Sequence, residues 1–289
     1  MEVTVIGLGL IGGSLCAAVR ECGLAKRIRG VDSSPLHRAQ AVELGLVDAA
    51  LPLEEALAGA DLVVLAIPVN ALIELLPRVL TQADPSSTVT DMGSTKELIC
   101  RAVEGHPQRR RYVPSHPMSG TENSGPTAFV PTLFARKTAV ICEKELCEPF
   151  HLERVEGLYR ALKMRLVHMS PKEHDLHAAY VSHLSHVISF VLANTVLEKE
   201  QDVNTIFDLA GGGFESTVRL AKSTPTMWTP IFEQNRTHVL NALDSYLDHL
   251  RAFRDSLTQP STDENFRLIE NANRIRRALE SMATRGTKT

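Results

Sequence analysis

The sequence predicts an α/β fold in which a mostly parallel sheet is followed by a part made only of helices. As far as His168, short apolar runs alternate with amphipathic stretches long enough for a helix, a pattern typical of crossover units. Beyond His168 the strand pattern stops, and helical periodicity continues toward the end of the chain. We therefore expect two domains, residues 1–168 and residues 169–289, with the boundary near Met169.

The first domain is expected to contain short apolar strands separated by helices. Residues 61–67, with the sequence DLVVLAI, form a continuous apolar run, as in a strand that is covered on both faces. The expected strands are residues 3–6, 28–31, 61–67, 88–90, 112–114, 138–142 and 165–168. The expected helices between them are residues 14–22, 35–44, 71–80, 95–103 and 149–162.

The second domain begins with a strong helix-start signal. Ser170-Pro171-Lys172-Glu173 has the form of a capping box with proline at the first helical position. The helix that it opens is expected to continue to about Lys199. Further helices are expected at residues 204–209, 216–223, 229–257 and 262–281.

The composition is that of a globular protein and argues against several functional classes. Hydrophobic residues make up 44% of the 289 residues, too many for a disordered chain. A net charge of −3 gives no basic footprint for nucleic acid, so we expect no nucleic-acid partner. The five cysteines are odd in number and form no C-x-x-C pair. This favours a reducing, cytoplasmic location and argues against disulfides or a zinc site.

Two uncharged stretches resemble membrane segments but have a better explanation. Residues 3–19 contain four glycines and follow Glu2 instead of a basic segment, so a signal peptide is not expected. Residues 176–197 include three histidines and Asn194, polar groups that would be costly in lipid. We expect a buried helix of a globular domain there, and no association with a membrane.

The first strand is followed by a glycine motif, which consists of Gly7, Leu8, Gly9, Leu10, Ile11 and Gly12. Glycines at this spacing allow a tight turn and let backbone N–H groups approach a pyrophosphate at a helix N-terminus. Asp32 ends the second strand twenty residues after Gly12, where a carboxylate would bind the adenosine ribose hydroxyls. These features predict a Rossmann-type dinucleotide-binding domain. Because Asp32 repels a 2′-phosphate and residues 33–35 contain no arginine, we expect NAD instead of NADP.

Further candidates follow the ends of predicted strands, where an open parallel sheet binds its ligands: Pro68, Asp91, Ser94 and His116. Ser94-Thr95-Lys96-Glu97 has the form of a capping box, so Ser94 has a structural alternative as a helix N-cap. His116 precedes Pro117 directly after a strand. In a nicotinamide-binding domain, a histidine there is well placed to take up a proton during hydride transfer, although a structural role stays open.

The long helix after Ser170 carries four histidines, His174, His177, His183 and His186. On a regular helix the last two point roughly opposite to the first two, and no carboxylate or cysteine completes either pair at the spacing of a zinc site. We therefore expect no metal. Ser182, His186 and Ser189 instead form a polar stripe, which must be hydrogen-bonded or line a site. Arg219, which follows a break at residues 211–213, is either a surface residue or a carboxylate anchor.

Five segments carry a specific resemblance. They are GLGLIGGSL at residues 7–15, DMGSTK at 91–96, SHPMSGTENSG at 115–125, SHLSH at 182–186 and GGGFESTVRLAKSTPTMW at 211–228. In this order, over nearly the whole chain, they resemble the prephenate dehydrogenase family, some members of which use arogenate. The resemblance implies NAD-dependent oxidative decarboxylation of prephenate to 4-hydroxyphenylpyruvate in tyrosine biosynthesis. It also implies that the helical part is the dimerisation domain of a homodimer.

The resemblance assigns roles to individual residues. It implies that His116 accepts the hydrogen bond and then the proton of the ring 4-hydroxyl, while hydride passes from C4 to NAD⁺, CO₂ leaves and the ring becomes aromatic. Ser94 matches the serine that orients this histidine and the hydroxyl. Arg219 matches the arginine that binds a substrate carboxylate, and Glu122 matches an acidic residue that gates the pocket through it. The side-chain end of the substrate is expected to contact His186, Ser182, Thr121 and Gly212.

Two positions depart from the family pattern without removing a catalytic group. Ser119 stands where alanine is common, and Ser185 stands where proline is common. Because the chain ends at Thr289, we expect no appended regulatory or chorismate mutase domain. Any inhibition by tyrosine is then expected to be competitive at the active site.

Three alternatives to an NAD-dependent prephenate dehydrogenase were compared with the sequence. The nearest is an arogenate or dual-specificity cyclohexadienyl dehydrogenase, because His186 favours the keto acid prephenate only weakly over an amine. A non-catalytic NAD(H) sensor would require only the glycine motif and Asp32. The presence of His116, Ser94 and Arg219 therefore argues against it. A β-hydroxyacid dehydrogenase would require a lysine on the long helix, and none occurs between Glu173 and Glu198.

Overall fold

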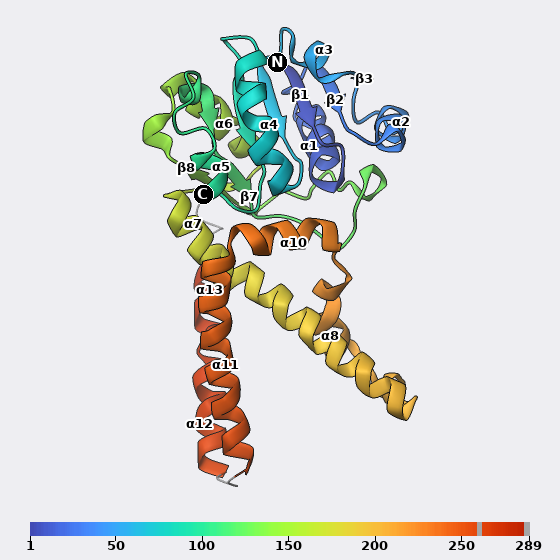
Figure 1. The fold of residues 1–289 in the computed structure, drawn as a ribbon, viewed down its shortest axis with the longest axis vertical. Helices are drawn as coiled ribbons and strands as arrows, with labels where there is room; N and C mark the ends of the chain where they lie inside the picture. Colours follow the sequence, from blue (N-terminus) through green and yellow to red (C-terminus); the bar gives the residue numbers. More distant parts are fainter. Residues whose placement is uncertain (259–261, 286–289) are drawn as a thin grey trace. The chain divides into compact units, whose positions relative to one another are not determined.

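The computed structural model describes residues 1–258 and 262–285 and divides into two compact units, Met1–Arg236 and the part from Thr237 onward. The sheets, the glycine motif and the candidate site residues all lie in the first unit (Figure 1). This division differs from the predicted domains, residues 1–168 and 169–289, because helices that follow Ser170 pack against helices of the sheet-containing part. The boundary near Met169 stays a prediction.

The first unit is built on a parallel sheet with the strand order β3-β2-β1-β4-β5-β6. These strands are β1 (Glu2–Ile6), β2 (Arg27–Val31), β3 (Ala49–Ala50), β4 (Leu62–Leu65), β5 (Thr88–Asp91) and β6 (Tyr112–Val113). Every neighbouring pair is parallel, which confirms the predicted α/β fold. The chain order reverses between β1 and β4, and open α/β sheets bind their ligands beyond the carboxyl ends of the strands at such a point.

Helices pack on both faces of this sheet: α1 (Leu10–Glu21), α2 (Pro35–Glu43), α3 (Leu53–Leu57), α4 (Val69–Gln82), α5 (Glu97–Arg101) and α6 (Pro149–Ala161). The alternation along β4 shows how the two layers form. Leu62 and Val64 pack with side chains of α1 and α6, whereas Val63 and Leu65 pack with side chains of α3, α4 and α5. All four are fully buried, which explains the continuous apolar sequence of this strand.

A smaller sheet consists of β7 (Ser115–Pro117), β8 (Thr138–Cys142) and β9 (Arg165–Met169). β7 is antiparallel to β8, and β8 is parallel to β9. β7 was not predicted, because three residues that include a histidine and a proline show no strand pattern in the sequence. β3 and α3 were not predicted either, because they are too short to show a periodicity. α1 begins at Leu10, four residues earlier than predicted, so that Gly12 and Gly13 are helical.

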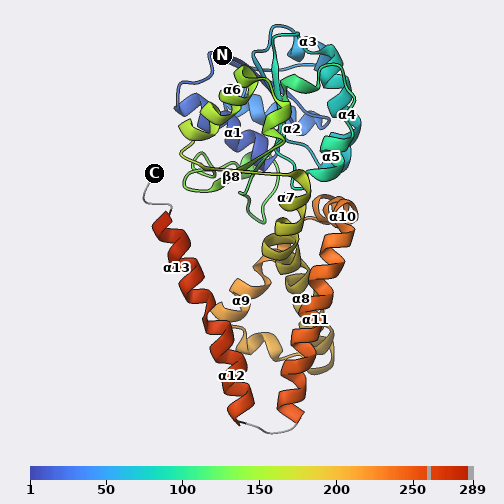
Figure 2. The same ribbon diagram turned by 90° about the vertical axis from the view of Figure 1, so that its left-hand side faces the viewer.

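The helical part begins with one continuous helix made of α7 (Pro171–Ala178), the π-helical segment η4 (Ala179–His183) and α8 (Leu184–Val203) (Figure 2). The predicted capping box is confirmed. Ser170 Oγ accepts the Glu173 N–H at 3.2 Å, and Glu173 Oε2 accepts the Ser170 N–H at 2.9 Å. The π-helical segment was not predicted, and it changes which side chains share a face of this helix.

The remaining helices are α9 (Gly212–Val218), α10 (Pro225–Gln234), α11 (Arg236–Thr258), α12 (Thr262–Asn273) and α13 (Ile275–Arg285). Short 3₁₀ turns lie at η1 (Arg109–Arg111), η2 (Pro126–Ala128), η3 (Lys144–Leu146), η5 (Ile206–Leu209) and η6 (Arg219–Lys222). The long helices predicted at residues 229–257 and 262–281 are each two helices, which separate at Asn235 and at Arg274. Neither break is marked by proline or glycine, so the sequence periodicity runs through both.

The continuous helix Pro171–Val203 is long and apolar enough to cross a membrane by length and composition alone, and 22% of its most apolar window is buried. It also carries buried polar side chains, His174, Asp175, His183 and Ser189. Each of them forms a hydrogen bond within the first unit. Apolar length is therefore weak evidence for a membrane span here, and the absence of a membrane association stays a prediction.

Two glycines of the motif are required by backbone packing between β1, α1 and β4. Gly7 has φ +95°, and a Cβ there would lie 2.3 Å from the carbonyl oxygen of Ala66. A Cβ on Gly12 would lie 1.8 Å from the carbonyl oxygen of Gly7. Both obstacles are backbone atoms, which cannot move aside without shifting the turn. A Cβ on Gly9, in contrast, would meet no atom within 4 Å.

We expect Gly12→Ala to destabilise the protein by about 1–3 kcal/mol or more, because the added methyl group overlaps backbone. Gly9→Ala is the matched control and is expected to unfold at nearly the wild-type temperature. Thermal unfolding followed by circular dichroism distinguishes the two variants. Equal melting temperatures would show that the close packing of Gly12 is not what the turn requires.

Candidate active site

The first turn of α1 has no side-chain cap among the described residues. Its N-cap is Gly9, where an added Cβ would meet no atom within 4 Å. The first N–H groups of a helix lack partners within the helix and carry the positive end of its dipole, so they bind phosphate readily. The turn from Gly7 to Gly12, with Leu8, Leu10 and Ile11 between the glycines, therefore fits the pyrophosphate of a dinucleotide.

Asp32 follows β2 and lies against this glycine turn. Its Oδ2 accepts the Leu8 N–H and its Oδ1 accepts the Ser34 N–H, both at 2.8 Å. The carboxylate is therefore fixed where a dinucleotide ribose binds in sheets of this type. Pro68 is exposed directly before α4, and so it lies at the same carboxyl edge of the sheet.

Arg38 on α2 is a cation near Asp32 that the sequence analysis missed, because it considered only residues 33–35. Its Nη1 donates to the carbonyl oxygens of Asp32 at 2.6 Å and of Ser33 at 3.3 Å. The guanidinium is thus bound to the backbone, while the Asp32 carboxylate remains directed at the glycine turn. This arrangement keeps a negative charge where a 2′-phosphate would bind.

The segment between β7 and β8 passes over the starts of α1 and α2. Its turn η2 contacts both helices, and the Val130 N–H donates to Ser14 Oγ at 2.9 Å. The segment carries Thr121 and Glu122. Glu122 Oε2 pairs with Arg219 Nη1 at 2.8 Å, which links this segment to η6. The backbone N–H of Glu122 and the Arg219 guanidinium lower the pKa of Glu122, so its carboxylate is ionised at neutral pH.

His116 lies on β7 and is only 8% exposed. Its Nδ1 lies 2.8 Å from Nε2 of His174, and Nδ1 of His174 lies 2.7 Å from Oδ1 of Asp175. Burial lowers the pKa of His116 well below its usual range, and the neighbouring His174, Lys96 and His183 lower it further. The imidazole of His116 is therefore neutral at pH 7 and able to accept a proton.

Ser94 is not the N-cap that its sequence predicts. α5 begins only at Glu97, and no side chain of the described residues 94–97 caps it. Instead, Asp175 from α7 accepts the N–H of Lys96 at 2.7 Å and the N–H of Glu97 at 2.9 Å. The structural alternative for Ser94 is therefore wrong. Its half-buried hydroxyl forms no hydrogen bond within the described part of the chain.

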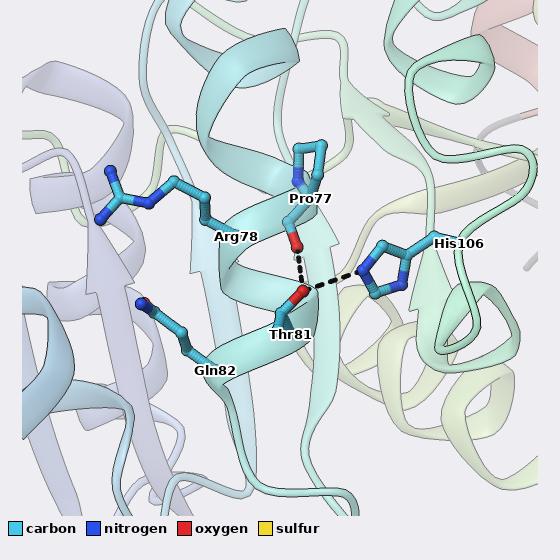
Figure 3. Close-up of a pocket in the computed structure, with 5 residues that line it drawn as sticks. All are labelled: Pro77, Arg78, Thr81, Gln82 and His106. Atoms are coloured by element: carbon cyan, nitrogen blue, oxygen red, sulfur yellow. Dashed lines mark hydrogen bonds between the residues drawn. The ribbon is translucent and has the colours of Figure 1, made fainter.

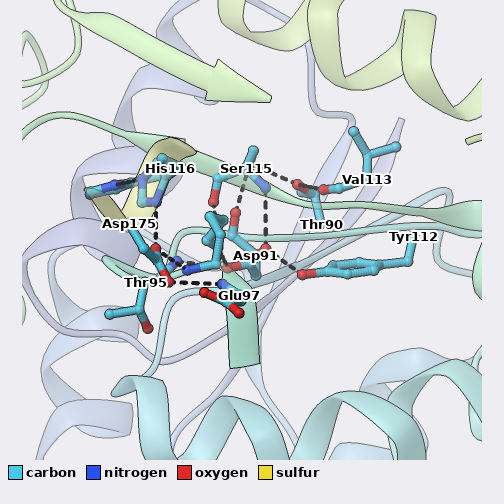
Figure 4. A network of polar contacts seen from close by, with 12 residues as sticks. Thr90, Asp91, Thr95, Glu97, Tyr112, Val113, Ser115, His116 and Asp175 are labelled. Carbon is cyan, nitrogen blue, oxygen red and sulfur yellow. Dashed lines mark hydrogen bonds and ion pairs between the residues drawn. The ribbon is translucent and has the colours of Figure 1, made fainter. Parts of the chain in front are cut away.

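A buried ion pair between Asp91 and Lys96 holds the strand that carries His116. Asp91 Oδ1 accepts the Tyr112 hydroxyl at 2.7 Å and the Ser115 N–H at 3.2 Å (Figure 4). Lys96 Nζ donates to the Ser115 carbonyl oxygen at 2.9 Å, and Ser115 Oγ donates to the Asp91 carbonyl oxygen at 2.7 Å. Every polar backbone and side-chain group of Ser115 is thus bound, which fixes the position of His116. The sequence analysis assigned no role to Lys96.

The prediction that His183 points away from His174 is wrong. Asn235 Nδ2 donates to the Asp175 carbonyl oxygen at 2.7 Å and lies 3.1 Å from Nδ1 of His183. His183 therefore joins the same buried cluster, and burial lowers its pKa to about 4. The helical wheel failed because the π-helical segment η4 adds a residue to one turn, which rotates all later positions by about 100°.

His186 stacks on Trp228, with ring centroids 3.5 Å apart and planes at 26°. Its Nδ1 lies 3.0 Å from the Ser182 carbonyl oxygen. Burial lowers the pKa of His186 and the charge of Arg219 lowers it further, whereas the contact with Ser182 acts to raise it. The indole Nε1 of Trp228 is buried without a partner among the described residues. The remaining predicted contact, Gly212, is exposed at the start of α9.

Neither a metal-binding cluster nor the cavity on α4 contributes to this site in the described part of the chain. Within residues 1–258 and 262–285, no group of three or more His, Cys, Asp or Glu side chains is arranged to hold a metal ion. A separate cavity of about 240 Å³ lies on α4 and is lined by Pro77, Arg78, Thr81, Gln82 and His106 (Figure 3). Within its lining, Thr81 Oγ1 donates to the Pro77 carbonyl oxygen at 3.0 Å and lies 3.1 Å from His106 Nε2. None of the predicted site residues lines it.

The chain matches two family models: "Prephenate dehydrogenase, nucleotide-binding domain" over residues 15–168, and "Prephenate dehydrogenase, dimerization domain" over residues 170–271. It is 29% identical to a prephenate dehydrogenase of Bacillus subtilis, over 96% of this chain and 76% of that protein.

Two solved structures are similar over 96% of the chain. One is prephenate dehydrogenase of Aquifex aeolicus in complex with hydroxyphenyl propionate and NAD⁺, with a TM-score of 0.87, 28% identity and 97% of that chain covered. The other is arogenate dehydrogenase of Synechocystis, with a TM-score of 0.75, 27% identity and 100% of that chain covered. Taken with the two family models, these likenesses show that the chain belongs to the prephenate dehydrogenase family.

Proposed function

We propose that the protein is an NAD-dependent prephenate dehydrogenase, which converts prephenate to 4-hydroxyphenylpyruvate by oxidative decarboxylation in tyrosine biosynthesis. The observation that carries this proposal is the state of His116, a buried neutral imidazole held through Nδ1 in the same unit as a glycine turn that fits a dinucleotide. The prephenate dehydrogenases of Bacillus subtilis and Aquifex aeolicus support the reaction type.

NAD is the cofactor that suits the glycine turn. The N–H groups at the start of α1 would hold the pyrophosphate, Asp32 would bind the ribose hydroxyls, and Pro68 would lie beside the cofactor at the edge of β4. When bound there, NAD⁺ supplies the acceptor for the hydride that leaves ring C4. The related prephenate dehydrogenase of Aquifex aeolicus, solved in complex with NAD⁺, supports this assignment.

His116 is assigned the role of base. As the ring 4-hydroxyl loses its proton, the O–H bond breaks and the proton is taken up at Nε2 of His116, while hydride leaves ring C4. The departing CO₂ leaves the electron pair of its C–C bond in the ring, which becomes aromatic. Nε2 of His116 then returns the proton to the phenolate oxygen, which gives 4-hydroxyphenylpyruvate and the neutral imidazole. Aromatisation supplies the driving force, and a positioned base contributes typically about 10²–10⁴ in rate. The hydroxyl of Ser94, which no described residue binds, is free to hydrogen-bond the same substrate oxygen.

Arg219 is assigned to a substrate carboxylate. It is 49% exposed and already holds the carboxylate of Glu122, so a substrate carboxylate would replace Glu122 on the same guanidinium. Glu122 then acts as the gate of the pocket. The side-chain end of the substrate would contact residues around this pair, His186, Ser182, Thr121 and Gly212.

The neutral form of the His186 ring favours prephenate over arogenate as the substrate. The neutral ring has one nitrogen beside the Ser182 carbonyl oxygen, and it offers no negative charge to an ammonium group. The alternative is an arogenate dehydrogenase or a cyclohexadienyl dehydrogenase with dual specificity, and the similar arogenate dehydrogenase of Synechocystis supports this alternative. The matched dimerization-domain model supports a homodimer. We also assign a cytoplasmic location and competitive inhibition by tyrosine.

Purified protein is expected to form NADH from NAD⁺ with prephenate, to be slower with arogenate, and to be much slower with NADP⁺. Absorbance at the NADH band gives all three rates. Turnover of arogenate but not of prephenate would leave the proposed mechanism unchanged and would identify arogenate as the substrate. Measurable NAD binding without turnover of either compound would favour a non-catalytic NAD(H) sensor.

We expect His116→Ala to lower kcat by about 10²–10⁴-fold, because the base is lost. The Kd for NAD⁺, measured by calorimetry, should stay within a few-fold of wild type, since His116 is not part of the glycine turn. Near-normal turnover in this variant would refute the assigned role.

Arg219→Ala is expected to raise KM for prephenate by about 10–100-fold with a smaller change in kcat, which is the effect of losing about 1.5–3 kcal/mol of charge-assisted hydrogen bonding. Arg78→Ala is the control, because Arg78 is an exposed arginine on α4 whose ion pair with Glu54 lies outside the site. Steady-state kinetics of both variants test the assignment. An unchanged KM for Arg219→Ala would place this arginine outside the substrate site.

A further inference from the structure

Three buried side chains form a hydrogen-bonded row that ends at the assigned base. Asp175 and His174 are each 2% exposed, and His116 is 8% exposed. The row runs from Asp175 Oδ1 to His174 Nδ1 at 2.7 Å, and from His174 Nε2 to His116 Nδ1 at 2.8 Å. Asp175 and His174 belong to α7, whereas His116 belongs to β7, so the row joins the helical part to the strand that carries the base.

The protonation state of each member follows from Asp175. Both of its carboxylate oxygens accept backbone N–H groups, from Lys96 and Glu97, and hydrogen bonds donated to the charged form favour the ionised carboxylate. Although burial acts to raise it, the pKa of Asp175 is lowered by hydrogen bonds from His174, Glu97 and Lys96. Asp175 is therefore an acceptor only, and the proton between it and His174 lies on His174 Nδ1.

The direction of the second hydrogen bond is then fixed. Burial lowers the pKa of His174, so its ring is neutral and carries a single N–H, at Nδ1. Its Nε2 is an acceptor, and the N–H in the contact with His116 must come from His116 Nδ1. The neutral ring of His116 consequently has a lone pair on Nε2. That atom has no partner within residues 1–258 and 262–285, and it is not one of the fully buried unpaired atoms there.

Resting on the proposed function, we propose that His174, held by Asp175, is the positioning residue that sets the tautomer of His116 and keeps its Nε2 free to accept the substrate proton. This role differs from that of Ser94, which would contact the substrate hydroxyl. After proton transfer, the His116 imidazolium retains its Nδ1–H bond to His174. The Asp175 carboxylate at the far end of the row then offsets its charge through His174.

The other titratable groups near the row do not bind Nδ1 of His116 in place of His174. Lys96, the nearest buried cation, is paired with Asp91 and bound to the Ser115 carbonyl oxygen. His183 is neutral and bound to Asn235, so it neither donates to nor accepts from His116. Among the residues that the structure describes, the contact with Nδ1 of His116 comes from His174.

The direct test is the ¹⁵N spectrum of the histidine side chains in the intact protein, because Nδ1–H and Nε2–H tautomers differ in their ring nitrogen shifts. The His116 signals are assigned by their loss in His116→Gln. We expect wild-type His116 to be the Nδ1–H tautomer at neutral pH. An Nε2–H tautomer in the wild-type protein would overturn the proposal, and this measurement needs neither a variant of His174 nor any turnover.

The kinetic test compares two substitutions of His174. His174→Gln keeps an oxygen able to accept from His116, whereas His174→Leu removes the acceptor while filling the space. We expect His174→Leu to lower kcat by about 10²-fold or more, with little change in KM or in NAD⁺ affinity, and to convert His116 largely to the Nε2–H tautomer. His174→Gln is expected to retain kcat within about 10-fold and to retain the tautomer.

His151→Leu provides the matched control, because His151 is also a buried histidine but is bound to Thr88 and forms no hydrogen bond with the described members of the row. It is expected to leave both kcat and the His116 tautomer unchanged. Equal kcat values for the Gln and Leu variants of His174, with an unaltered tautomer, would show that His174 only fills space. If the wild-type protein turned over neither prephenate nor arogenate, the proposed function would fail while the tautomer measurement still decided the role of His174.

Discussion

The carboxylate of Asp175 is the interaction on which the site depends. It accepts three hydrogen bonds, from the backbone of Lys96 and of Glu97 and from the ring of His174. Helix α5 therefore begins on a side chain supplied by α7, and the same side chain orients the row that ends at His116. A buried carboxylate is tolerated only when its lone pairs are used in this way, so the start of α5 and the histidine row stabilise each other.

A second buried charge, on Lys96, extends this constraint to the strand that carries His116. Lys96 follows directly from the backbone that Asp175 binds, and its ammonium group pairs with Asp91 and holds the Ser115 carbonyl oxygen. β7 is only three residues long and includes a proline, so its own ladder gives it little stability. The hydrogen bonds to Ser115 supply what the ladder lacks. A charge that would be costly alone is thus part of a network in which each member is paired.

The parts of the fold that follow from local signals were predictable from the sequence. The glycine turn, the apolar β4 and the capping box at Ser170 each carry their own sequence pattern, and they occur as predicted. The parts that depend on distant partners were not. Ser94 has the sequence of an N-cap, but the first N–H groups of α5 are bound by Asp175. Asp175 lies 79 residues after Lys96 and 78 residues after Glu97 in the chain. His183 was misplaced because a π-helical segment has no periodic signature, so its side-chain register cannot be read from a helical wheel.

Under the proposed function, the contrast between buried and exposed ion pairs explains why the substrate site would use a half-exposed arginine. A dianionic substrate requires a cation, and the fully buried Lys96 is committed to Asp91, which it cannot leave without stranding a buried carboxylate. Arg219 has a partner that is replaceable, because Glu122 lies on a surface segment and would be hydrated once released. Exchange of Glu122 for a substrate carboxylate therefore changes the net charge at the guanidinium very little. Under the proposed function, buried pairs fix the base, and the exposed pair is the one that opens to bind substrate.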